Sequence, residues 1–311
     1  MVGDAYPWSL FLGNDLQVMR VLNLASMDFA NMSHENANSL RAVGVDCVDW
    51  TFQRHVFNYQ TQSEQATIND IAKHYMSYDC VQVFHSDPRI FEVVRNHPKL
   101  IIYHTGTRYR NNKEFYDSLF RGQRIFTDQC EFLLHNKDFT YIAPHFSFVD
   151  PRPKRYDGTI TIGHFPSNPI VKGTDKIKEM IKPFKDKFNF NIDETRYPHY
   201  NNLQRIAKCD IYIELFQPLL NGKLYGCFGV TAFEATALGC LVITNNLNPA
   251  AYEDVYGNHN FILANNEEKF HNILNVITKD NFQLIRESTH NGFIGKHNME
   301  AAGKHLLNLL K

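Results

Sequence analysis

The chain has 311 residues, of which 43% are hydrophobic and 21% are charged, and its formal net charge is −1. This length suits two domains of about 150 residues each, and the composition is that of an ordinary globular protein. The near-zero charge gives no general reason to bind nucleic acid or an anionic membrane. No apolar run reaches the roughly 18 residues of a transmembrane helix.

The start of the chain does not resemble a secretory signal peptide, because it lacks a basic segment followed by a long apolar core. The first convincing strand begins after Met19, so residues 1–18 are treated as an appendage, native or not. Six cysteines show no C-x-x-C spacing and fall mostly on predicted buried elements. These features predict free thiols in a reducing cytoplasm, in a protein that is dissolved there or peripheral to a membrane. The oligomeric state is left open.

Residues 19–152 form the first predicted domain, in which strands and helices alternate. The predicted strands are 20–25, 47–51, 79–84, 100–103, 124–127 and 140–142, and the predicted helices are 35–42, 64–75, 88 onward and 112–120. Alternation of this kind implies right-handed βαβ units and a doubly wound α/β sheet. Ser33 is expected to cap the first helix, and Gly44 to end it.

Two loops of this domain follow predicted strands, and doubly wound sheets bind their ligands beyond the carboxyl ends of the strands. The first loop, 26–33, offers Asn31, Met32 and Ser33 on the acceptor side of such a site. The alternative is an ordinary capped turn without a ligand.

The second loop begins at His104, directly after the strand 100–103. An imidazole at this place can donate a hydrogen bond or steady a developing charge, although a lone histidine is more often structural. Arg108 and Arg110 follow and form a local basic group. This group either meets an acidic acceptor or is a solvated rim.

The segment 150–158, DPRPKRYDG, is rich in proline, glycine and charge and marks the expected domain boundary. The second domain is expected over residues 158–296. Its predicted strands are 159–164, 210–215, 241–244 and 261–264, and its predicted helices are 175–188, 201–208, 230–238 and 267–278. A last helix with apolar spacing is predicted over 297–310.

The segment 222–246, GKLYGCFGVTAFEATALGCLVITNN, carries the strongest functional signal. A turn with Gly226 and Gly229 leads into a helix that begins with Val230 and Thr231. The first N–H groups of such a helix lack partners and lie at the positive end of its dipole, which makes the turn an anion site. Glu234 lies about one turn into the helix, where it could accept a hydrogen bond from a ribose. The alternative is a plain loop–helix–strand unit whose glutamate pairs locally.

This segment resembles the carboxyl-terminal signature of GT-B glycosyltransferases, in particular retaining glycosyltransferase family 4, E-G-F-G-x-x-x-x-E-A-x-A-x-G-x-P-V-[IV]. The matching residues are Phe228, Gly229, Glu234, Ala235, Ala237, Gly239, Val242 and Ile243. The resemblance implies two Rossmann-like domains that face each other across a cleft, with the last helix, 297–311, packed back on the first domain. It also implies that Glu234 holds the ribose of the nucleotide. The family's first glutamate falls on Gly226, so its task near the donor sugar is unfilled or done by backbone.

A second segment, GHFPSNPIVKG, resembles the family's G-R-x-x-x-x-K-G element, with Lys172 and Gly173 in place. In the family the arginine and the lysine clamp the diphosphate, so the resemblance gives that role to Lys172. His164 replaces the arginine and would be only partly protonated near neutral pH. Ser167 and Asn168 are available as further donors. Lys172 is predicted at a helix start, where the dipole disfavours a cation, and this mismatch favours an anionic partner.

The resemblance also implies roles for the first domain. Family members often place a histidine near the donor sugar, which suggests a catalytic role for His104 beside Lys172 and Glu234. They also carry a glycine-rich loop near the phosphates, where this chain has Ala30 and Asn31 and no glycine pair. Positioning and leaving-group stabilisation account for the family's front-face reaction, so no metal ion or other cofactor is expected.

The predicted function is transfer of a hexosyl group from a UDP-sugar such as UDP-glucose, or from GDP-mannose, to a hydroxyl acceptor. The acceptor is a glycan, a lipid-linked sugar, a protein or a modified DNA base. One alternative is a protein that binds sugar nucleotides with weak catalysis or none, which the departures at Gly226 and His164 suggest. Another is a different two-Rossmann-domain enzyme, an epimerase or an oxidoreductase, although no G-x-G-x-x-G follows the first strand.

Overall fold

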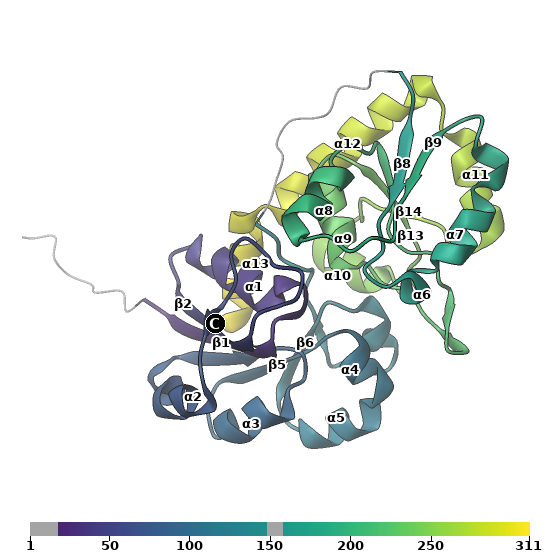
Figure 1. The fold of residues 1–311 in the computed structure, drawn as a ribbon. Helices are drawn as coiled ribbons and strands as arrows, with labels where there is room; N and C mark the ends of the chain where they lie inside the picture. The colour runs from purple at the N-terminus through teal and green to yellow at the C-terminus, as the bar shows by residue number, and fades with distance from the viewer. Residues whose placement is uncertain (1–17, 148–157) are drawn as a thin grey trace, which may run out of the picture.

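The computed structural model describes residues 18–147 and 158–311 of the chain. Nearly all of the expected appendage and most of the expected domain boundary therefore lie outside the described residues. The described chain forms two parallel β-sheets, each covered by helices, and the two sheet domains lie next to each other (Figure 1).

The first sheet is parallel throughout, in the order β3–β2–β1–β4–β5–β6–β7. Within it β1 pairs with both β2 and β4, so that Leu22 lies opposite Val48 on one side and Val81 on the other. Leu22 and Val81 have no exposed surface, as expected for central strands covered on both faces. The strands are β1 Arg20–Met27, β2 Asp46–Gln53, β3 Glu64–Gln65, β4 Cys80–Val83, β5 Leu100–His104, β6 Arg124–Thr127 and β7 Thr140–Tyr141.

The helices of this domain are α1 Met32–Arg41, α2 Ile68–His74, α3 Pro88–Val94, α4 Gly106–Asn111 and α5 Lys113–Leu119. The start of α1 differs from the prediction. The carboxylate of Asp28 accepts hydrogen bonds from the backbone N–H groups of Ser33 and His34, at 2.8 and 3.0 Å. The prediction that the Ser33 side chain caps this helix is therefore wrong. α2 begins later than predicted, because Thr67 and Asp70 form a reciprocal capping pair at its start.

The second sheet is also parallel, in the order β14–β13–β10–β8–β9. Its strands are β8 Thr161–His164, β9 Asn189–Ile192, β10 Ile211–Ile213, β13 Leu241–Thr244 and β14 Ile262–Leu263. A short antiparallel hairpin lies outside this sheet, and its strands are β11 Leu219–Leu220 and β12 Lys223–Leu224.

The helices of the second domain are α6 Pro169–Lys172, α7 Thr174–Met180, α8 His199–Ile206, α9 Val230–Ala237, α10 Ala250–Tyr256, α11 Glu267–Val276 and α12 Lys279–His297. The predicted helix 175–188 is shorter than expected, since α7 ends at Met180. Pro183 lies in the 3-10 turn that follows, and a proline cannot donate the next helical hydrogen bond.

The last helix, α13 Met299–Leu310, packs on α1 of the first domain. Gly303 permits this close approach, because a Cβ built there would overlap the carbonyl oxygen of Ser39 in α1. Leu306 and Leu310 have no exposed surface and join the same apolar cluster as Val21 of β1. The chain thus returns to the first domain at its end, as Figure 1 shows.

No helix in the described ranges is both long enough and apolar enough to cross a membrane. The six cysteines all fall within those ranges and are buried, and none of them forms a disulfide.

Candidate active site

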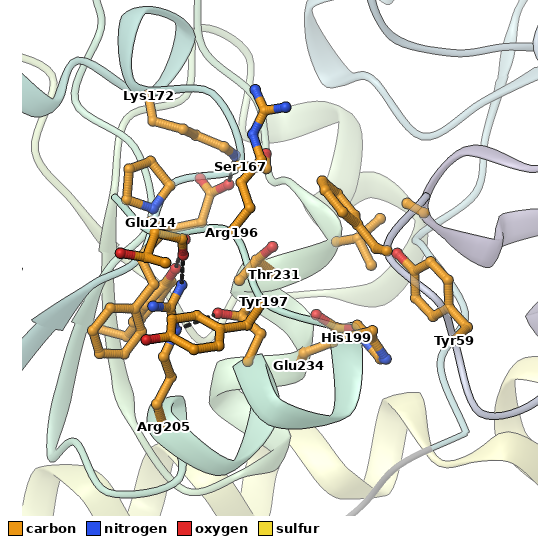
Figure 2. Close-up of a pocket in the computed structure, with 18 residues that line it drawn as sticks. Tyr59, Ser167, Lys172, Arg196, Tyr197, His199, Arg205, Glu214, Thr231 and Glu234 are labelled. Carbon is orange, nitrogen blue, oxygen red and sulfur yellow. Dashed lines mark hydrogen bonds and ion pairs between the residues drawn. The ribbon is translucent and has the colours of Figure 1, made fainter. Parts of the chain in front are cut away.

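A cavity lies between the two domains, and loops that follow β1, β2, β8, β9 and β10 line it. Its empty space, counted out to the open mouth, is about 750 Å³. The first domain contributes Ala30, Phe57 and Tyr59, and the second domain contributes the other lining residues (Figure 2). This is the edge at which doubly wound sheets bind ligands.

The start of α9 lies at this cavity, and Val230 and Thr231 line it. Gly229 precedes the helix as its N-cap, and no side chain of the described residues caps the first turn. The first N–H groups therefore lack a side-chain acceptor, and the positive end of the helix dipole lies at the cavity. This arrangement can bind an anion.

An ion pair between Lys172 and Glu214 lies beside the start of α9. A Cβ built on Gly229 would come within 3.3 Å of the Lys172 Nζ, so no larger residue fits there without displacing the pair. The Glu214 side chain is fully buried, and it also accepts a hydrogen bond from the Thr244 hydroxyl at 3.1 Å. Lys172 is the last residue of α6 and directly precedes Gly173, the N-cap of α7, so it lies at a helix end as well as just before a helix start.

Gly173 holds this corner of the cavity in shape. Its φ of 72° is in the left-handed region, and a Cβ there would overlap the carbonyl oxygen of Phe216. The Phe216 N–H in turn donates to the Lys172 carbonyl at 3.1 Å, which ties the segment of Lys172 to the segment of Glu214.

We expect Gly173→Ala to lower the free energy of unfolding by about 1–3 kcal/mol more than Gly222→Ala. Gly222, in the turn between β11 and β12, has a similar φ of 74° but has nothing within 4 Å of a built Cβ, so its substitution costs only the conformational strain. Denaturant unfolding of both variants measures the difference. Equal losses would mean that the contact with Phe216 is unimportant.

Glu234 lies on α9 and accepts a hydrogen bond through its Oε1 from the Nε2 of His199, at 2.6 Å. The first domain holds His199 in place. The Tyr59 ring lies 4.2 Å from the imidazole ring, and the Phe57 carbonyl accepts from the His199 N–H at 2.7 Å. The Glu234 Oε2 has no hydrogen-bond partner among the described residues, so it is available to a ligand.

A smaller space of about 270 Å³ continues from the cavity past Glu234, lined by Asn31, Glu35 and His145 among others. Within residues 18–147 and 158–311 the Glu35 Oε2 and the His145 Nδ1 are buried and form no hydrogen bond, while the Ser147 hydroxyl lies near enough to the Glu35 carboxylate to offset part of the effect of burial on its pKa. Burial raises the pKa of Glu35, and burial lowers the pKa of His145 to about 4. This space therefore holds uncommitted polar atoms from the first domain.

The loop after β1 makes its turn without glycine. Ala30 and Asn31 adopt φ angles of 55° and 57°, which side chains rarely occupy outside constrained sites. Ala30 lines both spaces and Asn31 lines the smaller one. Met32 and Ser33 are instead buried inside the first domain and do not line either space.

The aromatic end of the cavity is organised by Arg205 of α8. Its guanidinium lies 4.3 Å from the ring centre of Phe165 and 4.6 Å from that of Tyr197, and it forms an ion pair of 2.9 Å with Asp193. In Figure 2 Arg205 and Tyr197 lie at one end of the cavity and Lys172 at the other. A planar group can stack at this end.

The structure does not bring His104 to the cavity. Its side chain is fully buried within the first domain, stacked on Tyr109 at 4.1 Å and bonded to the Ser86 hydroxyl at 2.9 Å. Burial lowers its pKa to about 3, so it is a neutral core residue. The reason is orientation: the histidine belongs to β5, and its ring turns into the aromatic layer under the sheet.

His164 is also turned away from the cavity. Its Nδ1 bonds the Ile213 carbonyl at 2.7 Å, its Nε2 bonds the Thr174 hydroxyl at 2.9 Å, and burial lowers its pKa to about 4. Both ring nitrogens are therefore occupied, and the ring carries no charge for a phosphate. Of the neighbouring donors, Ser167 lines the cavity, whereas Asn168 caps α6 through Val171.

Gly226 and Phe228 contribute to the packing around the site rather than to its lining. A Cβ on Gly226 would lie 2.3 Å from the Asn245 Nδ2 and 3.0 Å from the Asn245 carbonyl oxygen, so a carboxylate side chain fits at this position only if Asn245 moves. Phe228 is fully buried, and Phe261 lies 4.6 Å from it. Neither residue lines the cavity.

The expected basic group of the first domain is paired. Arg108 lies 3.3 Å from Asp87, and Arg110 lies 2.6 Å from Glu131. Glu131 also accepts a hydrogen bond from the Gly226 N–H at 3.1 Å, so this pair links the two domains. Neither arginine lines the cavity, and the hypothesis of a basic surface for an acidic acceptor is not supported there.

Several cavity residues were missed by sequence reasoning, namely Tyr59, Arg196, Tyr197, His199, Arg205 and Glu214. Glu214 had a usable signal, because a carboxylate in the apolar run IYIELF needs a buried cation. The others lie on loops or at helix positions where the sequence has no distinctive spacing.

No protein-family model and no curated protein matches the sequence. Solved structures do match. The chain resembles the apo form of the lipopolysaccharide outer core galactosyltransferase WaaB over 93% of its length and 98% of that chain, with a TM-score of 0.57 and 11% identity. It also resembles the N-terminal domain of Candida albicans trehalose-6-phosphate phosphatase, over 94% of this chain and 96% of that one, with a TM-score of 0.56 and 9% identity.

A third match is a mutant of S. aureus TarM in complex with Fondaparinux, alpha-GlcNAc-glycerol and UDP, with a TM-score of 0.51 and 13% identity. It covers 78% of this chain and 58% of that one. Identities this low establish the fold alone. The chain has the predicted GT-B architecture of two Rossmann-like domains.

Proposed function

We propose that this protein is a retaining glycosyltransferase of the family 4 type, which transfers a hexosyl group from a nucleotide-sugar to a hydroxyl acceptor. One observation carries the proposal: the uncapped start of α9, Lys172 and Glu234 all border one cavity between the two domains. A diphosphate and a ribose are the groups that such a combination of donors and acceptor suits.

The residues account for the difficult step of the reaction. Negative charge builds on the β-phosphate as the sugar leaves, and Lys172 with the N–H groups of Val230 and Thr231 stabilises that charge. Glu234 holds the ribose through its available oxygen. The acceptor hydroxyl attacks the anomeric carbon from the same face as the bond to the β-phosphate oxygen breaks, and its proton passes to the departing phosphate. The protein contributes positioning and charge stabilisation, and the mechanism requires no metal ion.

Two features of the neighbours support this choice of donor. The name of WaaB describes a galactosyltransferase, and the TarM structure contains UDP. We therefore favour a UDP-sugar, with GDP-mannose as the second donor to test. The acceptor classes are a glycan, a lipid-linked sugar, a protein or a modified base.

A calorimetric screen of UDP-, GDP- and ADP-sugars tests donor binding, and release of the nucleoside diphosphate in the presence of candidate acceptors tests transfer. Heat of binding without any product would favour a sugar-nucleotide-binding protein. Binding of NAD(H) in place of every sugar nucleotide would favour an oxidoreductase.

Glu234→Gln should weaken binding of the preferred nucleoside diphosphate by about tenfold, because a carboxylate accepts a ribose hydrogen bond more strongly than an amide. The amide oxygen can still accept from His199, which limits structural disturbance. The 2′-deoxy and 3′-deoxy forms of the ligand provide the control. One of these deoxy forms should bind wild type more weakly than the parent ligand does, and Glu234→Gln should weaken its binding little further. If the losses of affinity from the deoxy form and from the substitution add up instead, the ribose does not contact Glu234.

A further inference from the structure

Among the described residues, most of the acidic and basic side chains that line the cavity have an ionic partner, and one of them has none. The acidic and basic side chains at the cavity are Lys172, Arg196, His199, Arg205, Glu214 and Glu234. Lys172 pairs with Glu214, His199 with Glu234, and Arg205 with Asp193 outside the lining. Within the described ranges, Arg196 forms no ion pair, side-chain hydrogen bond or ring contact.

The pairing determines the charge that a ligand meets. The cations of Lys172 and Arg205 are each balanced by a buried or half-buried carboxylate, so these two pairs contribute no net charge. Glu234 adds a negative charge near the start of α9. Arg196 is then the lining cation whose charge is not already balanced, and a diphosphate brings several negative charges into this space.

The position of Arg196 suits such a ligand. It is exposed and lies in the irregular loop between β9 and α8, where its neighbours Thr195 and Tyr197 also line the cavity. In the view of Figure 2 its side chain extends away from Arg205 toward the end of the cavity that Lys172 occupies. A guanidinium presents a planar fork of N–H donors that matches phosphate oxygens, and a residue without other partners can be reoriented at little cost.

We propose that Arg196 is the second cation that binds the diphosphate of the donor, together with Lys172. This inference rests on the proposed function and names a phosphate-binding residue at that same site. The sequence resemblance points to residue 164 for this task, but the His164 ring is buried with both nitrogens bonded. The loop after β9 would thus supply the phosphate-binding cation that is missing at the end of β8, where His164 lies.

The experiment compares UDP and uridine, and GDP and guanosine, by calorimetry and ligand-detected NMR on four proteins. These are wild type, Arg196→Gln, Arg196→Lys and Arg121→Gln, the last being an exposed arginine of the first domain that does not line the cavity. Arg196→Gln should weaken the preferred nucleoside diphosphate about tenfold or more and leave its nucleoside unchanged. Arg196→Lys should recover part of the loss, and Arg121→Gln should match wild type.

Salt dependence gives a second measurement. Affinity of wild type for the diphosphate should fall as salt is raised, and Arg196→Gln should show a shallower fall because one phosphate-binding cation is gone. Unchanged diphosphate affinity in Arg196→Gln, or equal losses for nucleoside and diphosphate, would overturn the inference while the proposed function stands. Absence of any nucleoside diphosphate binding by wild type would overturn both.

Discussion

Lys172→Ala should weaken donor binding about 100-fold, whereas Glu214→Gln should leave it unchanged or strengthen it by up to about tenfold. A charge-assisted hydrogen bond to phosphate is worth about 1.5–3 kcal/mol, which is a factor of about 10–150 in affinity. Removal of Lys172 also leaves the buried carboxylate of Glu214 uncompensated beside the start of α9, where it repels an anion. Glu214→Gln does the reverse, because it releases the Lys172 ammonium from its partner and removes a negative charge.

Opposite effects of the two substitutions on donor affinity distinguish a ligand-binding role of this ion pair from a structural role. Calorimetric titration with the preferred nucleoside diphosphate gives the affinities, and the thermal unfolding midpoint of each variant shows how much fold is lost. The double variant Lys172→Ala/Glu214→Gln removes the stranded carboxylate and should recover stability without recovering affinity. If both single variants weaken binding equally, the pair only holds the loop in shape.

The folded protein should lose stability steeply as the pH falls from about 6.5 toward 4. Four histidines are buried in a neutral state, and burial lowers their pKa values to about 3 for His104 and His297 and to about 4 for His145 and His164. Their ordinary pKa is 6.5, so between 6.5 and 4 the unfolded chain binds protons that the folded chain does not. The stabilisation by neutral histidines is therefore present above pH 6.5 and is lost as the pH falls through the folded pKa values.

The size of this effect is large compared with ordinary domain stability. A histidine whose pKa falls from 6.5 to about 4 contributes on the order of 3 kcal/mol, and four such groups together contribute on the order of 10 kcal/mol. Whole domains are stable by only about 5–15 kcal/mol. Asp128 and Glu35 oppose the trend, because burial raises the pKa of Asp128 to about 6 and also raises that of Glu35, but these two carboxyl groups are fewer than the four histidines.

Denaturant unfolding at a series of pH values measures how steeply the free energy of unfolding changes with pH. His104→Phe should make the slope shallower, since it removes one titrating group from an aromatic layer that can accept a ring. His74→Gln is the matched control, because His74 is an exposed histidine of the same domain. A stability that is flat between pH 6.5 and 4 would contradict the neutral burial of these histidines.

Elements with strong local signals were predictable in place and type. The strand 241–244 and the helix start at Val230 agree with β13 and α9, because an apolar run and a glycine turn mark them within a few residues. Pro88 begins α3 as expected, where Asp87 accepts hydrogen bonds from the first N–H groups. Such signals depend on neighbours along the chain, so the alternation of strands and helices and the α/β class followed from them.

The long helix α12 escaped prediction for a physical reason. Its buried face includes Arg286, His290 and His297 besides two phenylalanines, so an apolar periodicity does not show. Arg286 is buried because it pairs with Asp210, 76 residues earlier in the chain. Tertiary partners, rather than the side chains' own hydrophobicity, put this face inside.

The residues of the candidate site likewise differ in whether the sequence alone could identify them. The anion-binding turn, Lys172 and Glu234 were predictable because each is part of a local pattern of glycines and charges. Their partners were not, since Glu214 lies 42 residues from Lys172 and His199 lies 35 residues from Glu234. These pairs meet only when parallel strands bring their carboxyl ends to one edge and the first domain packs Tyr59 on His199. The same packing turns His104 and His164 inward, because the direction of a side chain at a strand end depends on the layers above and below it.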